Sequence, residues 1–195
     1  MVSKSQLQPP QATIPYGQMN LIINFRTLWL NLAIWTRAFL ISAVSGLPNT
    51  QSVSDRLYQI PVQISALLQL VFGQEASEKF LNLLSTHIVT MQQLITALNN
   101  GDSKASSENT ARLYQINQEI ATYLEKVNPF WVPPQWANLL DYYVNLTINE
   151  VTAMLSGEYA TDVQLFDRIQ YQTLLIGDYM ANGIIQYLSI RGIQP

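Results

Sequence analysis

The chain has 195 residues and a net charge of -3, and it contains no cysteine and one histidine. The lack of cysteine excludes a disulfide framework, a thiolate nucleophile and a zinc–sulfur site, and a single histidine excludes a multi-histidine metal site. The acidic balance leaves no basic surface for nucleic acid or for anionic lipid headgroups. Charged residues make up only 12% of the chain, about half of the average for soluble domains.

Residues 1–19 are rich in glutamine and proline, which predicts a disordered N-terminal tail before a single domain over residues 20–195. A secretory signal would place an apolar run directly after the first basic residue, and the first such run begins near Leu21. The segment Leu28–Val44 is apolar enough to suggest a membrane span, but Arg37 near its middle would be costly in hydrocarbon. We therefore expect a cytoplasmic protein without a membrane span.

Apolar residues recur every three or four positions in each long segment, and no segment alternates apolar with polar residues as a strand does. The chain is therefore expected to be all-helical, with helices over residues 20–45, 52–72, 74–98, 107–127, 133–155 and 161–190. Pro61 lacks a backbone donor and divides the second helix, with the break at Gln59 and Ile60. Thr161 and Gln164 have the spacing of a capping box at the start of the last helix.

Short connections between long amphipathic helices favour antiparallel neighbours. The expected architecture is an up-and-down helical bundle of the ferritin-like type, with four or five long helices and one helix broken by proline. Gly177 and Gly183 within the last helix indicate places where another element comes close. The aromatic residues Phe130, Trp131 and Trp136, near a pair of prolines, predict a packed corner between two helices in preference to a ligand cage.

Polar residues fall on apolar helix faces at two positions. His87 lies in the middle of the apolar stripe of its helix, so it is either a core histidine with one hydrogen-bond partner or a metal ligand or proton carrier. Glu150 shares a stripe with Tyr143, where an unpaired carboxylate is costly. Its compensating partner is expected to be His87, Arg37 or solvent. Arg37 in turn needs a carboxylate, for which Asp178 and Glu150 are the candidates, and we favour a structural ion pair over catalysis.

Complete catalytic motifs are missing from the sequence. A di-iron carboxylate bundle needs a Glu-x-x-His motif on two helices, but Leu84 stands three residues before His87. Gly-x-Ser-x-Gly and the glycine-rich phosphate loops are also absent, which argues against a hydrolase or a kinase. A site for one divalent metal ion would use His87 and Glu150, with Asp141 or Asp178 as the third ligand. The expectation is therefore either no cofactor or this single metal ion.

Further residues form a pattern that extends from about Leu21 to Tyr187. They are Leu28-Trp29, Trp35-Thr36-Arg37, Leu83-Leu84 with His87, Asn117, Asn128-Pro129-Phe130-Trp131, Gly157-Glu158-Tyr159 with Asp162, and Gly183-Ile184-Ile185. In these residues the chain resembles a family of small bacterial helical proteins that has no established activity and of which some members carry an acetylglutamate kinase label. An amino-acid kinase resembles an α/β sandwich with glycine-rich phosphate loops, so this label does not fit the chain.

The resemblance also implies a polar interior. The family tends to place further histidines at the positions of Leu32 and Tyr143, which together with His87 and Glu150 would form a polar, metal-binding bundle interior. Because both positions are replaced here, the resemblance implies that a metal site would be lost or altered in this chain. Asn117 belongs to the same family pattern, and we count it with the interior cluster.

The sequence thus predicts a non-enzymatic helical bundle that binds a partner protein or a small ligand, with no nucleic acid as partner. Its weakly charged, amide-rich surface also allows a homo-oligomer. The alternative is a ferritin-like bundle that binds a metal or another ligand in a buried polar cluster, with His87 and Glu150 as the metal ligands. That cluster comprises Arg37, His87, Asn117, Tyr143, Glu150 and Asp178.

Overall fold

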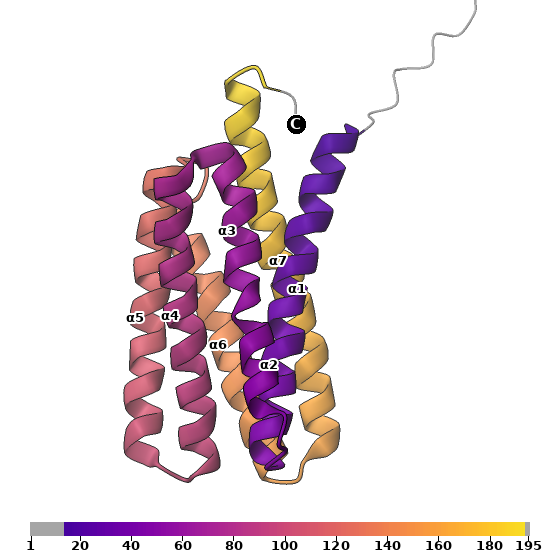
Figure 1. The fold of residues 1–195 in the computed structure, drawn as a ribbon, viewed down its shortest axis with the longest axis vertical. Helices are drawn as coiled ribbons and strands as arrows, with labels where there is room; N and C mark the ends of the chain where they lie inside the picture. Colours follow the sequence, from indigo (N-terminus) through magenta and orange to yellow (C-terminus); the bar gives the residue numbers. More distant parts are fainter. Residues whose placement is uncertain (1–13, 194–195) are drawn as a thin grey trace, which may run out of the picture.

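The computed structural model describes residues 14–193 and is all-helical in that range (Figure 1). Within it, five helices are long: α1 (Tyr16–Val44), α4 (Gln74–Asn99), α5 (Ser103–Val127), α6 (Pro133–Leu155) and α7 (Tyr159–Ile190). The shorter helices α2 (Thr50–Leu57) and α3 (Gln59–Phe72) follow each other with only Tyr58 between them. The prediction of an all-helical bundle is confirmed.

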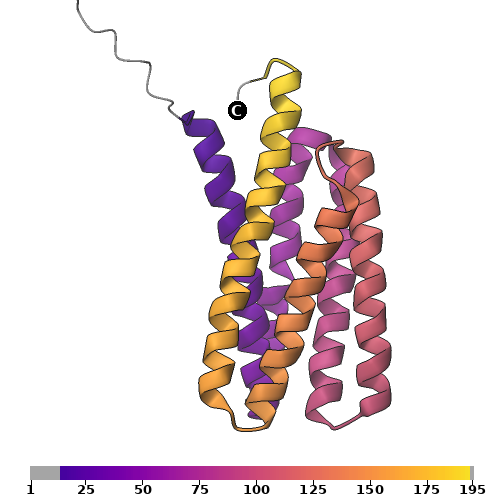
Figure 2. The ribbon, with the colours of Figure 1, turned by 180° about the vertical axis from the view of Figure 1, so that it is seen from behind.

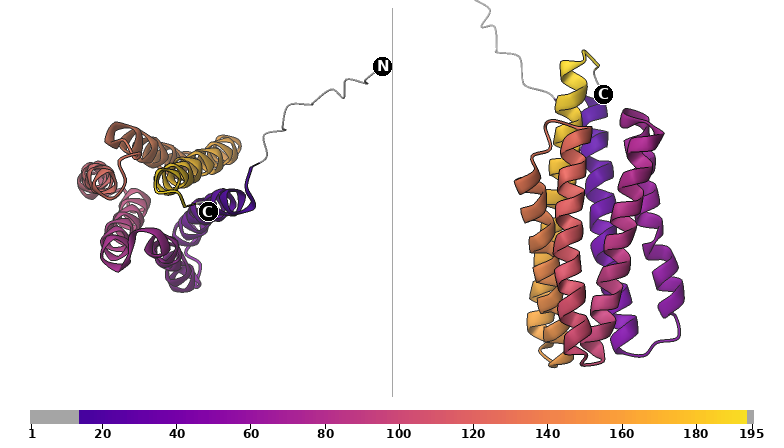
Figure 3. Two further views of the ribbon diagram at one scale, coloured as in Figure 1. Left: turned by 90° about the horizontal axis from the view of Figure 1, so that it is seen from above. Right: turned by 90° about the vertical axis from the view of Figure 1, so that its left-hand side faces the viewer.

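The helices form a ring in which successive members run in opposite directions (Figure 1 and Figure 3). The ring leads from α1 through the α2–α3 pair, α4, α5 and α6 to α7, which packs along α1 and closes it. The longest connections between these helices are residues 45–49 and 128–132. Such short connections keep sequential helices adjacent. The contact between α1 and α7 has no such connection, so it depends on packing and side-chain interactions.

The broken helix is interrupted at Tyr58, one residue before Gln59 and Ile60, where we expected the break. Pro61 is the third residue of α3 and not its first. The first turn of a helix has backbone N–H groups without intrahelical partners, so it tolerates proline beyond its first position. Because we assumed that Pro61 is the first residue of its helix, the predicted break lies one residue too far along the chain.

Besides α2, which begins at Thr50 and not at residue 52, three helix starts differ from the prediction. α5 begins at Ser103, because the Asp102 side chain accepts a hydrogen bond from the Ala105 backbone N–H at 2.9 Å and caps the helix. α7 begins at Tyr159, so Thr161 lies inside its first turn and does not cap it. α1 already begins at Tyr16, so residues 16–19 are helical although we assigned them to the tail. Residues 1–13 of the expected tail lie outside the described residues.

Two glycines in α7 allow close packing, as the sequence predicted. A Cβ atom at Gly177 would lie 2.8 Å from Cα of Arg26, so the backbones of α7 and α1 touch at this point. A Cβ atom at Gly183 would lie 2.0 Å from Nε1 of Trp131, so the indole ring lies directly against the α7 backbone. Any larger residue at either position would push α7 away from its neighbours.

The aromatic residues near the start of α6 form a packed corner. Trp131 and Trp136 are fully buried and meet edge to face, with ring centroids 6.1 Å apart. Trp136 also packs against Trp29 of α1, at 6.4 Å, and against Tyr179 of α7, at 5.2 Å. Aromatic pairs at these separations stabilise a core beyond the area they bury. The corner therefore joins α1, α6 and α7 at one end of the ring.

We expect Gly183→Ala to lower the free energy of unfolding by about 1–3 kcal/mol, the usual cost of overpacking a core. The added methyl group would overlap the Trp131 indole ring. Urea denaturation measures the effect. Asn182→Ala, at the adjacent exposed position, is the control and should change stability by less than about 0.5 kcal/mol. Equal stability of the two variants would contradict the packing described above.

Candidate functional site

One arginine joins two carboxylates in the interior of the bundle. The guanidinium of Arg37, from α1, donates to both carboxylate oxygens of Asp162, from α7, at 2.8 and 2.7 Å. It also donates to Oε1 of Glu150, from α6. The two acidic side chains are only 2% and 5% exposed, and the guanidinium lies 4.6 Å from the Phe166 ring centroid. The cluster of Arg37, Glu150 and Asp162 therefore ties three helices together at a buried position.

The chain brings these three residues together at the α6–α7 turn. Glu150 lies near the end of α6, and Asp162 lies in the first turn of α7, with only residues 156–158 between the two helices. A carboxylate in the first turn of a helix interacts favourably with the helix dipole. Arg37 lies in the second half of α1, which reaches the same end of the bundle (Figure 1).

The charges of this cluster do not balance, because one guanidinium faces two carboxylates. The pKa of Glu150 is raised to about 7, mainly by burial and also by the charge of Asp162, although the hydrogen bond and the charge of Arg37 act in the opposite direction. The hydrogen bonds from Arg37, first of all to Asp162, raise the pKa of the guanidinium itself. The second carboxylate thus has a pKa within the physiological range.

His87 is buried in α4 and is neutral. Burial lowers its pKa to about 4, and the nearby Asn117 carboxamide opposes this only in part. Neither Nδ1 of His87 nor Oδ1 of Asn117 has a partner within hydrogen-bonding geometry. The amide group of Asn117 donates to Oδ1 of Asp141 at 2.8 Å. Of the two interpretations of His87, the core histidine agrees better with this environment.

Tyr143 lies between the two polar groups. Its ring centroid is 6.3 Å from that of His87, and its hydroxyl donates to Oγ1 of Thr36 at 3.3 Å. Burial raises its pKa to about 12, and the charge of Glu150 contributes to the increase. Thr36 precedes Arg37 in α1. Polar side chains therefore follow one another through the interior, from the half-buried Asp141 to the Arg37 cluster.

Asp178 does not belong to this interior cluster, although the sequence suggested it as a partner of Arg37. It accepts hydrogen bonds from Arg26, one of them at 2.6 Å, in a largely exposed ion pair. Asp162 and Asp178 are about 24 Å apart along the helix axis, at 1.5 Å per residue, so both cannot reach Arg37. Asp162 was not among the partners expected for Arg37 from the sequence. The signal that could have indicated it is that Asp162 belongs to the family pattern.

A metal site is not assembled by the residues that the structure describes. No group of three or more His, Asp or Glu side chains lies close enough within residues 14–193 to hold a metal ion. His87 faces Asn117 and Tyr143, whereas Glu150 is bonded to Arg37. The guanidinium beside Glu150 would also repel a cation. The expected ligand pair of His87 and Glu150 is therefore divided between two polar groups.

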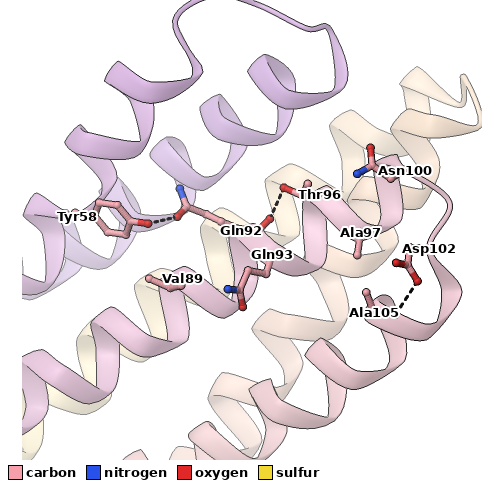
Figure 4. Close-up of a pocket in the computed structure, with 9 residues that line it drawn as sticks. All are labelled: Tyr58, Val89, Gln92, Gln93, Thr96, Ala97, Asn100, Asp102 and Ala105. Atoms are coloured by element: carbon pink, nitrogen blue, oxygen red, sulfur yellow. Dashed lines mark hydrogen bonds between the residues drawn. The ribbon is translucent and has the colours of Figure 1, made fainter.

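The outer surface of the bundle has several grooves, and two of them combine amide, tyrosine or charged side chains that no sequence pattern brings together. One, of about 390 Å³, lies between α4 and the start of α5 and is rich in amides (Figure 4). At its edge the Tyr58 hydroxyl donates to the carboxamide of Gln92, which donates in turn to Ser54. The other groove, of about 370 Å³, lies between α6 and α7 and is lined by Tyr142, Asp167, Arg168, Tyr171, Gln172 and Leu175.

Comparisons of the chain with protein-family models, with curated proteins and with solved structures find no match. Function must therefore be argued from the geometry of the molecule.

The stability of the protein should show two opposite pH effects that largely cancel. The native state holds a proton on Glu150 that the unfolded chain releases, so stability falls as the pH rises from 4.5 to about 7. The unfolded chain protonates His87 at its ordinary pKa of 6.5, while the native state stays neutral down to about 4, so stability falls as the pH drops through this window.

Replacing either Glu150 or His87 should therefore reveal the pH effect of the residue that is left. In Glu150→Gln the free energy of unfolding should rise by about 2–3 kcal/mol from pH 4.5 to 6.5, because only the His87 effect is left. In His87→Gln it should fall by a similar amount over the same range. Urea denaturation at each pH measures both slopes. A common slope in the wild type and the two variants would show that neither residue titrates as described.

Loss of Arg37 should be much more costly than loss of Arg26. At a pH above 7, Arg37→Met leaves two buried carboxylates without a counter-charge, and we expect a loss of about 3–5 kcal/mol. Arg26→Met removes a largely exposed pair with Asp178 and should cost less than about 1 kcal/mol. Thermal and urea unfolding compare the two variants. Similar losses would mean that the Arg37 cluster does not hold the bundle together.

Proposed function

We propose that this protein is a non-enzymatic helical bundle that binds a partner protein through the groove between α6 and α7. The observation that carries the proposal is the exposure of two tyrosines beside an arginine. Tyr171 is 65% exposed and Tyr142 is 43% exposed. Arg168 donates to the Tyr142 hydroxyl at 2.6 Å and lies 6.0 Å from its ring centroid. Tyrosine and arginine are the residue types that contribute most often to binding energy at protein interfaces.

The base of this groove is rigid. Gln172 is buried, and its side-chain amide donates to the Leu139 carbonyl of α6 at 2.8 Å. The hydrogen bond between Arg168 and Tyr142 holds the two side chains that form the wall. A binding surface whose side chains are already held loses less conformational entropy on association. Asp167 adds a negative charge beside Arg168, so the rim offers both signs of charge to a partner.

The interior supports a binding role over catalysis. Arg37 engages both buried carboxylates, and His87 is enclosed between α4, α5 and α6 side chains. None of these four side chains lines either of the two surface grooves described above. A general acid or base must reach its substrate, and the buried side chains of His87, Glu150 and Asp162 reach neither groove.

We also propose a plain up-and-down bundle in place of the ferritin-like type. Ferritin-like bundles contain one long crossover connection, whereas the connections here have five residues or fewer. Membership in the family of small bacterial helical proteins and a cytoplasmic location are further proposals. In support of the family, its quoted pattern includes Arg37, His87, Asn117 and Asp162, which all contribute to the polar interior.

A photo-cross-linking residue in place of Tyr171 tests the proposed groove in the native cells. We expect one dominant adduct, identified by mass spectrometry, whose yield falls about tenfold when Arg168→Ala is added, because such anchors contribute 1–2 kcal/mol or more. The control carries the cross-linker at Tyr159, which is equally exposed but outside the groove. The proposal fails if the Tyr171 position gives no adduct, or if both positions give the same one.

A further inference from the structure

The first and last helices extend beyond the rest of the bundle at one end. α1 and α7 touch at Gly177, and beyond this crossing they lean apart (Figure 1 and Figure 2). No residue of α1 before Phe25 is buried, and no residue of α7 after Ile184 is buried. The two described chain ends therefore project from the same end of the ring, which we call the open end: residues 14–24 and 185–193.

The side chains exposed at the open end are largely apolar. Six large hydrophobic residues there are each at least 43% exposed: Ile14, Tyr16, Met19, Ile23, Ile190 and Ile193. Soluble proteins rarely gather exposed apolar residues without charges between them, and where they do the surface is usually an interaction site.

Charge is distributed unequally between the open end and the rest of the chain. The sequence has no acidic residue before Asp55 and none after Asp178. Residues 1–25 contain one charged residue, Lys4, and residues 179–195 contain one, Arg191. The remaining eight basic and thirteen acidic residues give residues 26–178 a net charge of -5. The average charge of the chain conceals this asymmetry, in which the first 25 and the last 17 residues of the sequence carry no acidic side chain and the residues between them are acidic.

We propose that the open end docks on an anionic lipid bilayer. The apolar side chains would enter the boundary between headgroups and acyl chains, and Arg191 would face the lipid phosphates. Tyrosine is typical of this boundary, where its ring is apolar and its hydroxyl meets water. Tyr16 stands at the start of α1, where such a residue is expected. This inference is independent of the groove between α6 and α7.

The geometry favours docking over membrane insertion. Within residues 14–193, α1 is the one helix long and apolar enough to cross a bilayer. Its second half, however, is held in the bundle by the bonds of Arg37 to Glu150 and Asp162. The part before Phe25 is about 13 Å long, at 1.5 Å per residue, which is less than half of the hydrocarbon thickness of about 30 Å. This part of α1 can therefore occupy only a shallow position in one leaflet.

A bilayer also fits the charges better than a second copy of the chain. Two open ends meeting head to head would bring the Arg191 side chains of both copies together, with no acidic side chain in residues 14–24 or 185–193 to balance them. An anionic bilayer supplies phosphates to the basic residues and repels the acidic body. These two effects would hold the bundle upright on the surface.

Flotation of the full-length protein with vesicles tests this proposal. The vesicles contain phosphatidylcholine with one third phosphatidylglycerol, or phosphatidylcholine alone. We expect the wild type to float with the anionic vesicles, and M19Q/I23Q to bind about tenfold more weakly, since two apolar side chains are no longer buried. The control L155Q/V163Q changes residues of matched exposure, 40% and 54% against 43% and 51%, near the opposite end of the bundle. It should bind like the wild type.

Further measurements complete the test. R191Q should reduce the preference for anionic over neutral vesicles, and added salt should do the same for the wild type. Circular dichroism checks that each variant is folded. The proposal is overturned if the wild type does not float with the anionic vesicles, or if L155Q/V163Q loses as much binding as M19Q/I23Q. A dimer seen by light scattering that M19Q/I23Q dissociates, without vesicle binding, would assign the open end to a second copy.

Discussion

The closure of the helical ring depends on Arg37. Short connections already keep α1 to α7 in sequential contact, but nothing in the connectivity brings α7 back to α1. Three features do so: the bonds from Arg37 to Asp162, the exposed pair of Arg26 and Asp178, and the close approach at Gly177. Of the two ion pairs only that of Arg37 is buried, and its guanidinium also binds a second carboxylate, Glu150. Removing one partner of a buried ionic group leaves the others without compensation, so ring closure and interior charge are coupled.

The polar interior is a consequence of this closure and not a separate site. Glu150 and His87 are both destabilised in their charged forms by the same cause, the loss of hydration on burial. Tyr143 and Thr36 fill the space between them with hydroxyl groups. Since a carboxylate and an imidazole respond to burial with opposite pKa shifts, the interior keeps a nearly constant stability over the acidic range while its individual groups remain sensitive to pH.

Local patterns in the sequence were sufficient to predict the helices and the buried residues, but not which side chains pair with one another. The apolar stripes of α4 and α6 place His87 and Glu150 in the interior, as the structure has them. The start of α5 was misplaced because Asp102 was assigned to a loop, although its side chain caps the helix. The choice between Asp162 and Asp178 required the register of α7 against α1, which is set by long-range packing at Gly177. The grooves require two adjacent helices to be placed together, which no periodicity within one helix provides.

The two proposed surfaces are compatible in one orientation of the molecule. Tyr171 and Ile190 lie on the same helix and are separated by about 28 Å along its axis, at 1.5 Å per residue. The groove lies between α6 and α7 on the flank of the bundle. Both helices face the viewer in Figure 2, where the open end projects beyond the rest of the bundle. A bundle standing upright on a bilayer would therefore keep the groove exposed to the aqueous phase, well beyond one Debye length of about 8 Å from the charged surface. Its acidic body would present the tyrosine groove to partners at a fixed height above the membrane.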